Sequence, residues 1–131
     1  MKGKILHSMK PRAKKPLSGE AGVQFLIIQH LKIMYPNALY CASAGGMFTS
    51  MKQAIKMKAT GYVKGFPDLQ ICEPNGKYFG LFIEVKTEKG VVSKEQKEWI
   101  KQLNKRGYYA TYVKGFDEAI KVIDDYFKGT I

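Results

Sequence analysis

Cysteine is scarce in this chain of 131 residues, and the shortage excludes a disulfide-rich fold. The two cysteines, Cys41 and Cys72, are too few for a disulfide framework and do not form a CxxC motif. Both lie in segments with the pattern of strands, so we expect them to be buried free thiols. The two histidines, His7 and His30, form no ligand-spaced cluster with the cysteines, which argues against a structural zinc site.

Long apolar runs are also missing. The longest dense apolar run is FLII, residues 25–28, whereas a membrane-spanning helix needs about 20 apolar residues. The N-terminal segment MKGKILHSMKPRAKK is basic but contains no continuous apolar stretch, so it lacks the pattern of a secretory signal. We therefore expect a cytoplasmic protein with no membrane partner.

Acidic residues are few relative to basic ones. The chain has 11 Asp and Glu against 22 Lys and Arg, which gives a formal net charge of +11 at pH 7. So large an excess in a short chain favours an anionic partner, most often nucleic acid. The alternatives are a membrane surface, for which no strongly amphipathic basic helix stands apart, and a basic surface that only maintains solubility.

The length and a hydrophobic content of 45% predict one domain with a substantial core. Residues 1–16 contain six basic residues, two prolines and no acid. We expect them to form a flexible basic arm, which either contacts phosphate or has no role. The domain itself would comprise residues 17–131.

Hydrophobic periodicity predicts an α/β fold in which helices alternate with strands. The sequence Asn75-Gly76 predicts a tight hairpin, because both residue types tolerate positive φ angles. The strand–helix–strand step from 78–86 to 108–113 favours a parallel, right-handed pair. We therefore expect a mixed central sheet flanked by helices. The predicted strands are 38–42, 68–72, 78–86 and 108–113, and the predicted helices are 19–35, 49–58, 93–106 and a last helix capped by Asp117.

The helix predicted over 49–58 has two different sides. Met47, Met51 and Ile55 lie on one side, and lysines lie elsewhere. We expect the methionine side to pack against the core rather than to contact a cofactor.

Two charged residues interrupt the apolar strand LFIEVK, residues 81–86. Glu84 and Lys86 are two residues apart, so their side chains leave the same face of the strand. Two charges side by side in an apolar strand are costly to bury unless something compensates them. The hairpin brings Asp68, at the start of the preceding strand, nearly opposite Glu84. Two carboxylates that meet in this way repel unless a cation lies between them.

Hard oxygen ligands suit Mg²⁺ or Mn²⁺, which commonly bind one or two carboxylates together with phosphate oxygens. The main-chain carbonyl of Val85 could complete the protein ligands. Lys86 could orient the attacking water and stabilise the charge that develops on phosphorus. The pattern D-x15-E-x-K therefore predicts a metal-dependent phosphodiesterase. ExK alone is also common as a solvated strand face or a surface ion pair, and the combination with GFPD and the basic charge favours catalysis.

A longer stretch resembles the virus-type replication-repair nuclease (VRR-NUC) domain, a branch of the PD-(D/E)xK nuclease superfamily. The stretch reads KGFPDLQI and then GLFIEVKTEKGVVSKEQKEWIKQLNKRGYYATYV. The similarity extends from about residue 20 to about residue 125. Its motifs are G-x-P-D at Gly65, Pro67 and Asp68, E-V-K at Glu84, Val85 and Lys86, and S-x-x-Q at Ser93 and Gln96.

The resemblance implies a restriction-endonuclease-like αβββαβ core, dependence on Mg²⁺ or Mn²⁺, and cleavage of DNA. It implies that Asp68 and Glu84 are metal ligands and that Lys86 is the catalytic lysine. The helix predicted over 49–58 is an insertion relative to this core. Stand-alone members look like small homodimers that cut branched DNA such as four-way junctions. An enzyme of this type would suit a bacteriophage or prophage, and would then act in the host cytoplasm.

Two further residues each have two interpretations. Glu20 is the only acid of the first predicted helix, where the family has an acidic residue that assists the metal. A glutamate in a first turn also complements the helix dipole. Gln96 would lie near the active site by the same resemblance, and Ser93-x-x-Gln96 is also a capping box. For Gln96 both roles can hold at once.

The sequence therefore favours a metal-dependent DNA endonuclease of the repair or recombination kind. The alternative is a non-catalytic DNA-binding module that keeps the nuclease fold for its basic surface. A nucleotide-binding enzyme is excluded by the absence of a P-loop or of G-x-G-x-x-G after a strand. Lysines that flank the motifs could line a path for phosphates, although solvated surface lysines are the ordinary alternative. These lysines are Lys52, Lys56, Lys64, Lys89 and Lys94.

Overall fold

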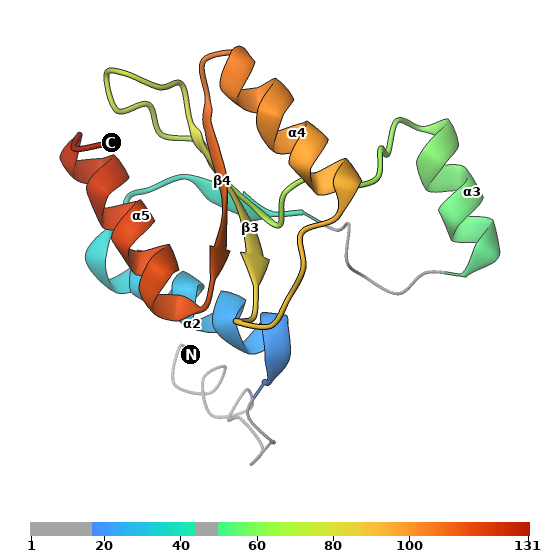
Figure 1. Ribbon diagram of the computed structural model, residues 1–131, viewed down its shortest axis with the longest axis horizontal. Coiled ribbons are helices and arrows are strands. Elements are labelled where there is room, and N and C mark those ends of the chain that lie inside the picture. Colours follow the sequence, from blue (N-terminus) through green and yellow to red (C-terminus); the bar gives the residue numbers. More distant parts are fainter. Residues whose placement is uncertain (1–16, 44–49) are drawn as a thin grey trace, which may run out of the picture.

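The computed structural model describes residues 17–43 and 50–131, and Figure 1 shows their arrangement. The basic arm predicted over 1–16 and the residue Met47 lie outside these ranges. The helices are α2 (Gly19–Met34), α3 (Met51–Ala59), α4 (Lys94–Lys105) and α5 (Phe116–Lys128). The strands are β1 (Tyr40–Ala42), β2 (Leu69–Ile71), β3 (Leu81–Lys86) and β4 (Tyr109–Lys114). No helix in the described ranges is long and apolar enough to cross a membrane.

The four strands form one mixed sheet in the order β1-β2-β3-β4. β1 pairs with β2 and β2 pairs with β3 in antiparallel fashion, whereas β3 and β4 are parallel. The predicted mixed sheet with a parallel last pair is therefore confirmed. β1 and β2 are shorter than predicted, with three residues each.

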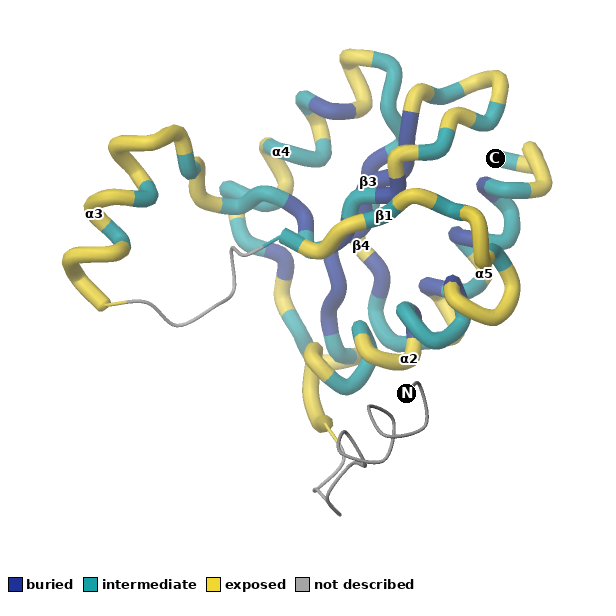
Figure 2. The backbone as a smooth tube through the Cα atoms, turned by 180° about the vertical axis from the view of Figure 1, so that it is seen from behind, coloured by how far each residue is buried: buried dark blue, intermediate teal, exposed yellow. Residues whose placement is uncertain are grey.

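Helices cover both faces of the sheet, and this burial on two sides leaves all six residues of β3 buried. On one face, Ile83 packs with Ile27 of α2 and Ile123 of α5. On the other face, Phe82 packs with Leu103 of α4. Figure 2 shows β3 as the buried centre of the molecule. A strand in this position has to compensate every polar side chain that it carries.

A hydrogen-bonded cluster joins α2 to α5. Asp124 Oδ1 lies 2.9 Å from His30 Nε2 and accepts a 2.7 Å hydrogen bond from the Tyr35 hydroxyl. Burial alone would raise the pKa of Asp124, but the hydrogen bonds from His30 and Tyr35 outweigh it and hold the pKa below its ordinary value of 3.8. Burial, reinforced by the bond to Asp124, raises the pKa of Tyr35 to about 12. The ionised carboxylate is thus the form that ties the two helices together.

We expect Asp124→Asn to lower the free energy of unfolding by about 1–3 kcal/mol near neutral pH, because it weakens two hydrogen bonds to a charged acceptor. A carboxylate whose folded pKa is depressed stabilises the protein above its unfolded pKa and loses that effect in acid. The difference from wild type should therefore shrink as the pH falls below 3.8. Urea denaturation at several pH values measures it. The exposed Asp117→Asn in the same helix is the control, and a deficit that persists in acid would contradict this role.

The hairpin turn before β3 differs from the prediction. Of Asn75 and Gly76, only Gly76 has a positive φ, of 88°. The Asn75 side chain closes the turn instead, since its Oδ1 accepts hydrogen bonds from the main-chain N–H groups of Lys77 and Tyr78. Its Nδ2 donates to the carbonyl of Tyr126 in α5. An asparagine side chain thus takes the place of the second left-handed residue that the prediction required.

The start of α5 also differs from the prediction. The helix begins at Phe116, and its N-cap is Gly115 rather than Asp117. Gly115 has a φ of 90°, which favours glycine at this position. Asp117 lies in the first turn, where its negative charge complements the helix dipole without capping the helix.

The prediction that the cysteines are buried is wrong. Cys41 and Cys72 are both exposed free thiols. Cys41 lies in β1, an edge strand whose residues are half-buried or exposed, and Cys72 directly follows β2. The composition of a strand does not reveal whether it lies at the edge or at the centre of its sheet, and the two positions differ in burial.

Helix α3 stands apart from the sheet, as Figure 1 shows. It begins after Ser50, and the side chains of Ser50 and Gln53 form a capping box. None of its residues is buried, and Met51 and Ile55 are 79% and 63% exposed. The prediction that this side packs against the core is therefore wrong for both residues. The periodicity of an amphipathic helix shows that it has an apolar side but not what covers that side.

Candidate functional site

The hairpin of β2 and β3 brings Asp68 and Glu84 opposite each other, as the sequence predicts. Leu69 pairs with Ile83, so the next pair along the ladder is Asp68 with Glu84. Asp68 Oδ2 accepts a 2.8 Å hydrogen bond from the main-chain N–H of Val85. This bond fixes the Asp68 carboxylate beside the end of β3. The sequence analysis gave a role only to the main-chain carbonyl of Val85. The hydrogen bond from its main-chain N–H to Asp68 was missed, although the predicted strand register could have indicated it.

The loop before Asp68 depends on Gly65. Gly65 has a φ of 98°, and a Cβ at this position would lie 2.7–2.8 Å from atoms of Glu95 at the start of α4. Glycine alone permits so close an approach. Pro67 is fully buried between this contact and β2. The motif G-x-P-D thus has a structural basis, because it packs the loop against α4 and directs Asp68 into the hairpin.

Glu84 is a carboxyl group only 2% exposed at the centre of the sheet. Its Oε2 accepts a 3.0 Å hydrogen bond from Gln96 Nε2 and lies 3.7 Å from Lys86 Nζ. Its Oε1 is buried and has no hydrogen-bond partner among the described residues. Burial raises the pKa of Glu84 to about 8, the neighbouring carboxylate of Asp68 adds to the rise, and the positive charge of Lys86 opposes it. Neighbouring protein groups therefore do not fully compensate a negative charge on Glu84.

In buffer with EDTA, we expect Glu84→Gln to be more stable than wild type above pH 8, by about 1–3 kcal/mol. Glutamine has nearly the same shape and stays neutral, whereas wild type must bury an ionised carboxylate. The pKa of Glu84 is about 8 in the folded protein, against an ordinary value of 4.5. Between pH 4.5 and pH 8 the folded state therefore binds a proton at Glu84 that the unfolded state has lost. The stability that this proton gives is lost as pH rises through the window.

Urea denaturation across this pH window measures the effect, and the slope with pH should be smaller in the variant. The control is Glu88→Gln, which removes an exposed carboxylate from the loop that follows β3. A Glu84→Gln protein that is less stable than wild type above pH 8 would mean that the attraction of Lys86 outweighs burial.

Lys86 is a nearly buried ammonium group at the end of β3, 8% exposed. Its side chain leaves the same face of the sheet as that of Glu84, which lies two residues earlier. Its Nζ lies 3.7 Å from Glu84 Oε2 and 4.0 Å from Glu20 Oε2. A Cβ at Gly90 would lie 3.1 Å from the Lys86 Cβ, so the following loop packs closely on the base of this side chain. Lys86 is therefore held with its charge beside the carboxylates.

Glu20 reaches the site from the first turn of α2. Its side chain is 49% exposed, and its carboxylate forms an ion pair with Lys86, with Oε2 lying 4.0 Å from Lys86 Nζ. Across residues 17–43 and 50–131, no group of three or more His, Cys, Asp or Glu has the arrangement of a metal site. The structure thus places Glu20 beside the lysine rather than in a three-carboxylate cluster.

Gln96 has two contacts at once. Its Oε1 accepts a 2.8 Å hydrogen bond from the Ser93 main-chain N–H, and its own main-chain N–H donates to Ser93 Oγ at 3.1 Å. The predicted capping box is confirmed. The Nε2 of the same side chain donates to Glu84 Oε2. The start of α4 therefore positions the central carboxylate of the hairpin.

The five flanking lysines are all exposed and are divided among three places. Lys52 and Lys56 lie on α3, and Lys89 lies in the loop that follows β3. Lys64 and Lys94 line a groove beside α4. Lys64 Nζ is also 3.5 Å from a Glu95 carboxylate oxygen, in an exposed ion pair. The structure thus divides the five lysines among a helix that stands apart from the sheet, one loop and one groove.

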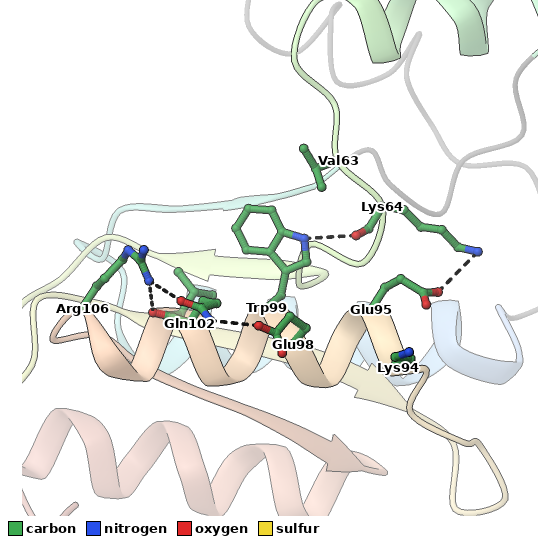
Figure 3. A pocket seen from close by; sticks show the side chains of 9 residues that line it. Val63, Lys64, Lys94, Glu95, Glu98, Trp99, Gln102 and Arg106 are labelled. Carbon is green, nitrogen blue, oxygen red and sulfur yellow. Dashed lines mark hydrogen bonds and ion pairs between the residues drawn. The ribbon is translucent and has the colours of Figure 1, made fainter.

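The groove beside α4 has a volume of about 740 Å³ and is shown in Figure 3. Val63, Trp99 and Leu103 form its apolar wall, and Trp99 Nε1 donates a 3.0 Å hydrogen bond to the Lys64 carbonyl. None of Asp68, Glu84 and Lys86 lines it. Sequence reasoning missed the groove, because it forms only where the loop before β2 meets α4.

Comparisons with known proteins find a related family. The sequence model of the VRR-NUC domain matches residues 24–117. The solved structure of a VRR_NUC domain protein shares 33% sequence identity with this chain at a TM-score of 0.70. The alignment covers 87% of this chain and 91% of that chain. No curated protein matches at a significant level. The range of the family match includes Asp68, Glu84, Lys86 and Gln96, whereas Glu20 lies before it.

Proposed function

Because the chain belongs to the VRR-NUC family of nuclease-type domains, we propose that it is a metal-dependent endonuclease that hydrolyses phosphodiester bonds in DNA. Its substrate is branched DNA such as a four-way junction. The nuclease domain comprises residues 17–131. The observation that carries the proposal is the buried carboxylate of Glu84, opposite Asp68 and beside Lys86.

The residues present fit a hard divalent cation, Mg²⁺ or Mn²⁺. Asp68 and Glu84 repel each other, and Glu84 Oε1 has no protein donor within the described residues. A cation between the two carboxylates would replace the missing donor and remove the repulsion. Mg²⁺ commonly takes one or two carboxylates and completes its shell with water and substrate phosphate oxygens. We therefore assign Asp68, Glu84 and the carbonyl of Val85 as ligands, with Glu20 as an outer acid.

Each remaining side chain has a role that follows from its position. When bound, the cation supplies Lewis-acid activation of the phosphate and of the attacking water. Lys86 stabilises the negative charge that develops on phosphorus and orients the water, because its ammonium is held beside the carboxylates. Gln96 holds Glu84 through Oε2 and leaves Oε1 available for the cation. The net charge of +11 attracts the DNA backbone.

A homodimer suits a junction substrate. Resolution of a four-way junction needs two symmetric nicks, and each chain carries one constellation of Asp68, Glu84 and Lys86. Two copies related by a two-fold axis place two such centres on one substrate. The competing function is a non-catalytic DNA-binding module, which the basic charge supports equally well. The complete set of two carboxylates and one lysine favours catalysis, since binding phosphate does not require buried acids.

The test is a cleavage assay with oligonucleotides of matched sequence in four forms: single strand, duplex, flap and four-way junction. Each is incubated with EDTA, Mg²⁺ or Mn²⁺, with the wild type and with Asp68→Asn. Metal-dependent nicks at symmetric positions of the junction, absent in the variant, are expected. Cleavage of flaps or plain duplex instead would support the nuclease activity and contradict the selectivity for junctions. Binding without cleavage in any metal would favour the binding module.

A further inference from the structure

The groove beside α4 begins next to the proposed catalytic site. Glu95 lines the groove, and its neighbour Gln96 donates the hydrogen bond that holds Glu84. Lys64 lines the groove from the loop that leads to Asp68, and Figure 3 shows this loop lying over α4. A groove in this place can hold part of the same DNA molecule that the carboxylates bind.

Trp99 is fixed within the groove. Its Nε1 donates a 3.0 Å hydrogen bond to the Lys64 carbonyl, and Phe66 packs edge-to-face with its ring, the ring centroids lying 4.9 Å apart. The side chain is nevertheless only half-buried, and it lines the groove together with Val63, which is 58% exposed. An indole held in this way can stack on a planar ligand without a large loss of side-chain entropy.

A chain of polar side chains runs along the groove beside Trp99. Glu98, Gln102 and Arg106 follow one another at intervals of four residues, so they share one face of α4. Gln102 Nε2 donates to Glu98 Oε1 at 2.8 Å, and Arg106 Nη1 donates to Gln102 Oε1 at 2.7 Å, as Figure 3 shows. Glu98 Oε2 and Arg106 Nη2 have no hydrogen-bond partner among the described residues. Both atoms can therefore bind the polar edge or the charged part of a ligand.

Two unpaired cations lie at the ends of the groove. Lys94 is the first residue of α4 and Arg106 is its C-cap, and both line the groove. Neither forms an ion pair with another described residue, whereas Lys64 pairs with Glu95 at 3.5 Å. Glu98 is the one lining acid that no described cation pairs. The unpaired charges are thus two positive and one negative, which favours a ligand that carries phosphates.

We infer that the groove binds a short unpaired segment of the DNA substrate, with one base stacked on Trp99 and the phosphates on either side at Lys94 and Arg106. A basic groove that contains an aromatic side chain is a common means of binding single-stranded DNA. α4 places the two cations about 18 Å apart along its axis, a span of a few nucleotides. The inference rests on the proposed function for its substrate, because bases at a branch point unstack at little cost.

A nucleotide satisfies the groove better than simpler ligands do. Its base has an aromatic face for Trp99 and a polar edge from which Glu98 Oε2 can accept a hydrogen bond. An apolar side chain has no polar edge, and an inorganic anion has no face to stack. The volume of about 740 Å³ lies within the range of sites that bind ligands of this size.

The first test uses the fluorescence of Trp99, the only tryptophan in the chain. The full chain in EDTA is titrated with a single-stranded hexanucleotide, with the same hexanucleotide lacking its bases, and with a blunt duplex. Anisotropy of a labelled DNA measures binding independently. The hexanucleotide should quench the fluorescence, and its abasic form should bind at least about 10-fold more weakly without quenching. Binding of the hexanucleotide without quenching, or equal quenching by the abasic form or the duplex, would overturn the inference.

The second test compares two substitutions that add the same charge. Val63→Glu places a carboxylate on the apolar wall of the groove and should weaken binding of the hexanucleotide by at least about 10-fold. Ile33→Glu, at an exposed apolar position of α2, is the matched control and should bind as wild type does. Both positions are exposed, so neither change should unfold the domain, and circular dichroism checks this. Equal affinities of the two variants would contradict binding in the groove.

The third test counts phosphate contacts. Lys94→Gln should reduce the slope of log affinity against log salt concentration by about 0.7, the loss of one contact with a single strand. Lys97→Gln, on the same helix but outside the lining of the groove, should leave the slope unchanged. An unchanged slope in Lys94→Gln would remove this lysine from the phosphate path and overturn the inferred orientation of the segment.

These tests use neither metal nor cleavage, so they separate the groove from the nuclease. A protein that binds the hexanucleotide with quenching of Trp99 but cuts no DNA would support the groove and reject the nuclease. A metal-dependent nuclease whose Trp99 fluorescence does not change when DNA binds would reject only the groove.

Discussion

Asp68→Asn should abolish DNA cleavage, with a loss of at least about 10³-fold in the single-turnover rate. The substitution removes one of the two negative charges that we assign to the cation. It keeps a side-chain oxygen that can still accept the hydrogen bond from the Val85 N–H, so the hairpin should remain intact. Binding to the same DNA in EDTA should be as tight as in wild type or tighter, because a negative charge near the phosphate is gone.

The measurement combines a single-turnover assay at saturating Mg²⁺ with a binding assay in EDTA. Glu88→Gln is the matched control, since it removes an exposed carboxylate two residues beyond Lys86 and should cleave at the wild-type rate. Substantial turnover by Asp68→Asn would remove Asp68 from the cation site. Loss of DNA binding in parallel with cleavage would show that the change damaged the fold rather than the chemistry.

Lys86→Met should lower the rate of cleavage by about 10²–10³-fold and alter the metal requirement little. Methionine keeps the buried stem of the side chain but not the ammonium, which lies 3.7 Å from Glu84 and 4.0 Å from Glu20. Without it, the negative charge that develops on phosphorus loses a nearby cation. The metal ligands that we assign are unchanged, so the Mg²⁺ concentration for half-maximal rate should stay close to that of wild type.

A titration of the single-turnover rate with Mg²⁺ separates the two quantities. Lys101→Met, an exposed lysine on α4 outside the site, is the control for the loss of one positive charge. A Lys86→Met protein as active as wild type would exclude the lysine from the mechanism. A rate that recovers fully at high Mg²⁺ would instead place Lys86 in metal binding.

The catalytic pattern could be predicted because its geometry is local. Glu84 and Lys86 share a face whatever the rest of the protein does, since the side chains of a strand alternate. One hairpin then suffices to bring Asp68 opposite Glu84, and the observed register of Leu69 with Ile83 agrees. The capping box of Ser93 and Gln96 is equally local, because both partners lie within one helical turn.

The largest errors of prediction concern which surfaces are covered. Met51 and Ile55 have the spacing of core residues, yet both are exposed on α3. Cys41 has the neighbours of a buried strand residue, yet it lies on an edge strand. Burial depends on segments that are distant in sequence, and the pattern of one segment carries no information about where the others lie.

The sequence by itself determined the chemical set of this protein: two carboxylates and one lysine joined by one hairpin, on a chain of charge +11. Tertiary structure decided the burial and the hydrogen bonds of these side chains. Packing of α4 against the sheet buries Glu84, gives its Oε2 the Gln96 amide and leaves its Oε1 without a donor among the described residues. Backbone geometry fixes how side chains a few residues apart are oriented. The free energy of a charge depends on everything that surrounds it, and only the folded chain supplies those surroundings.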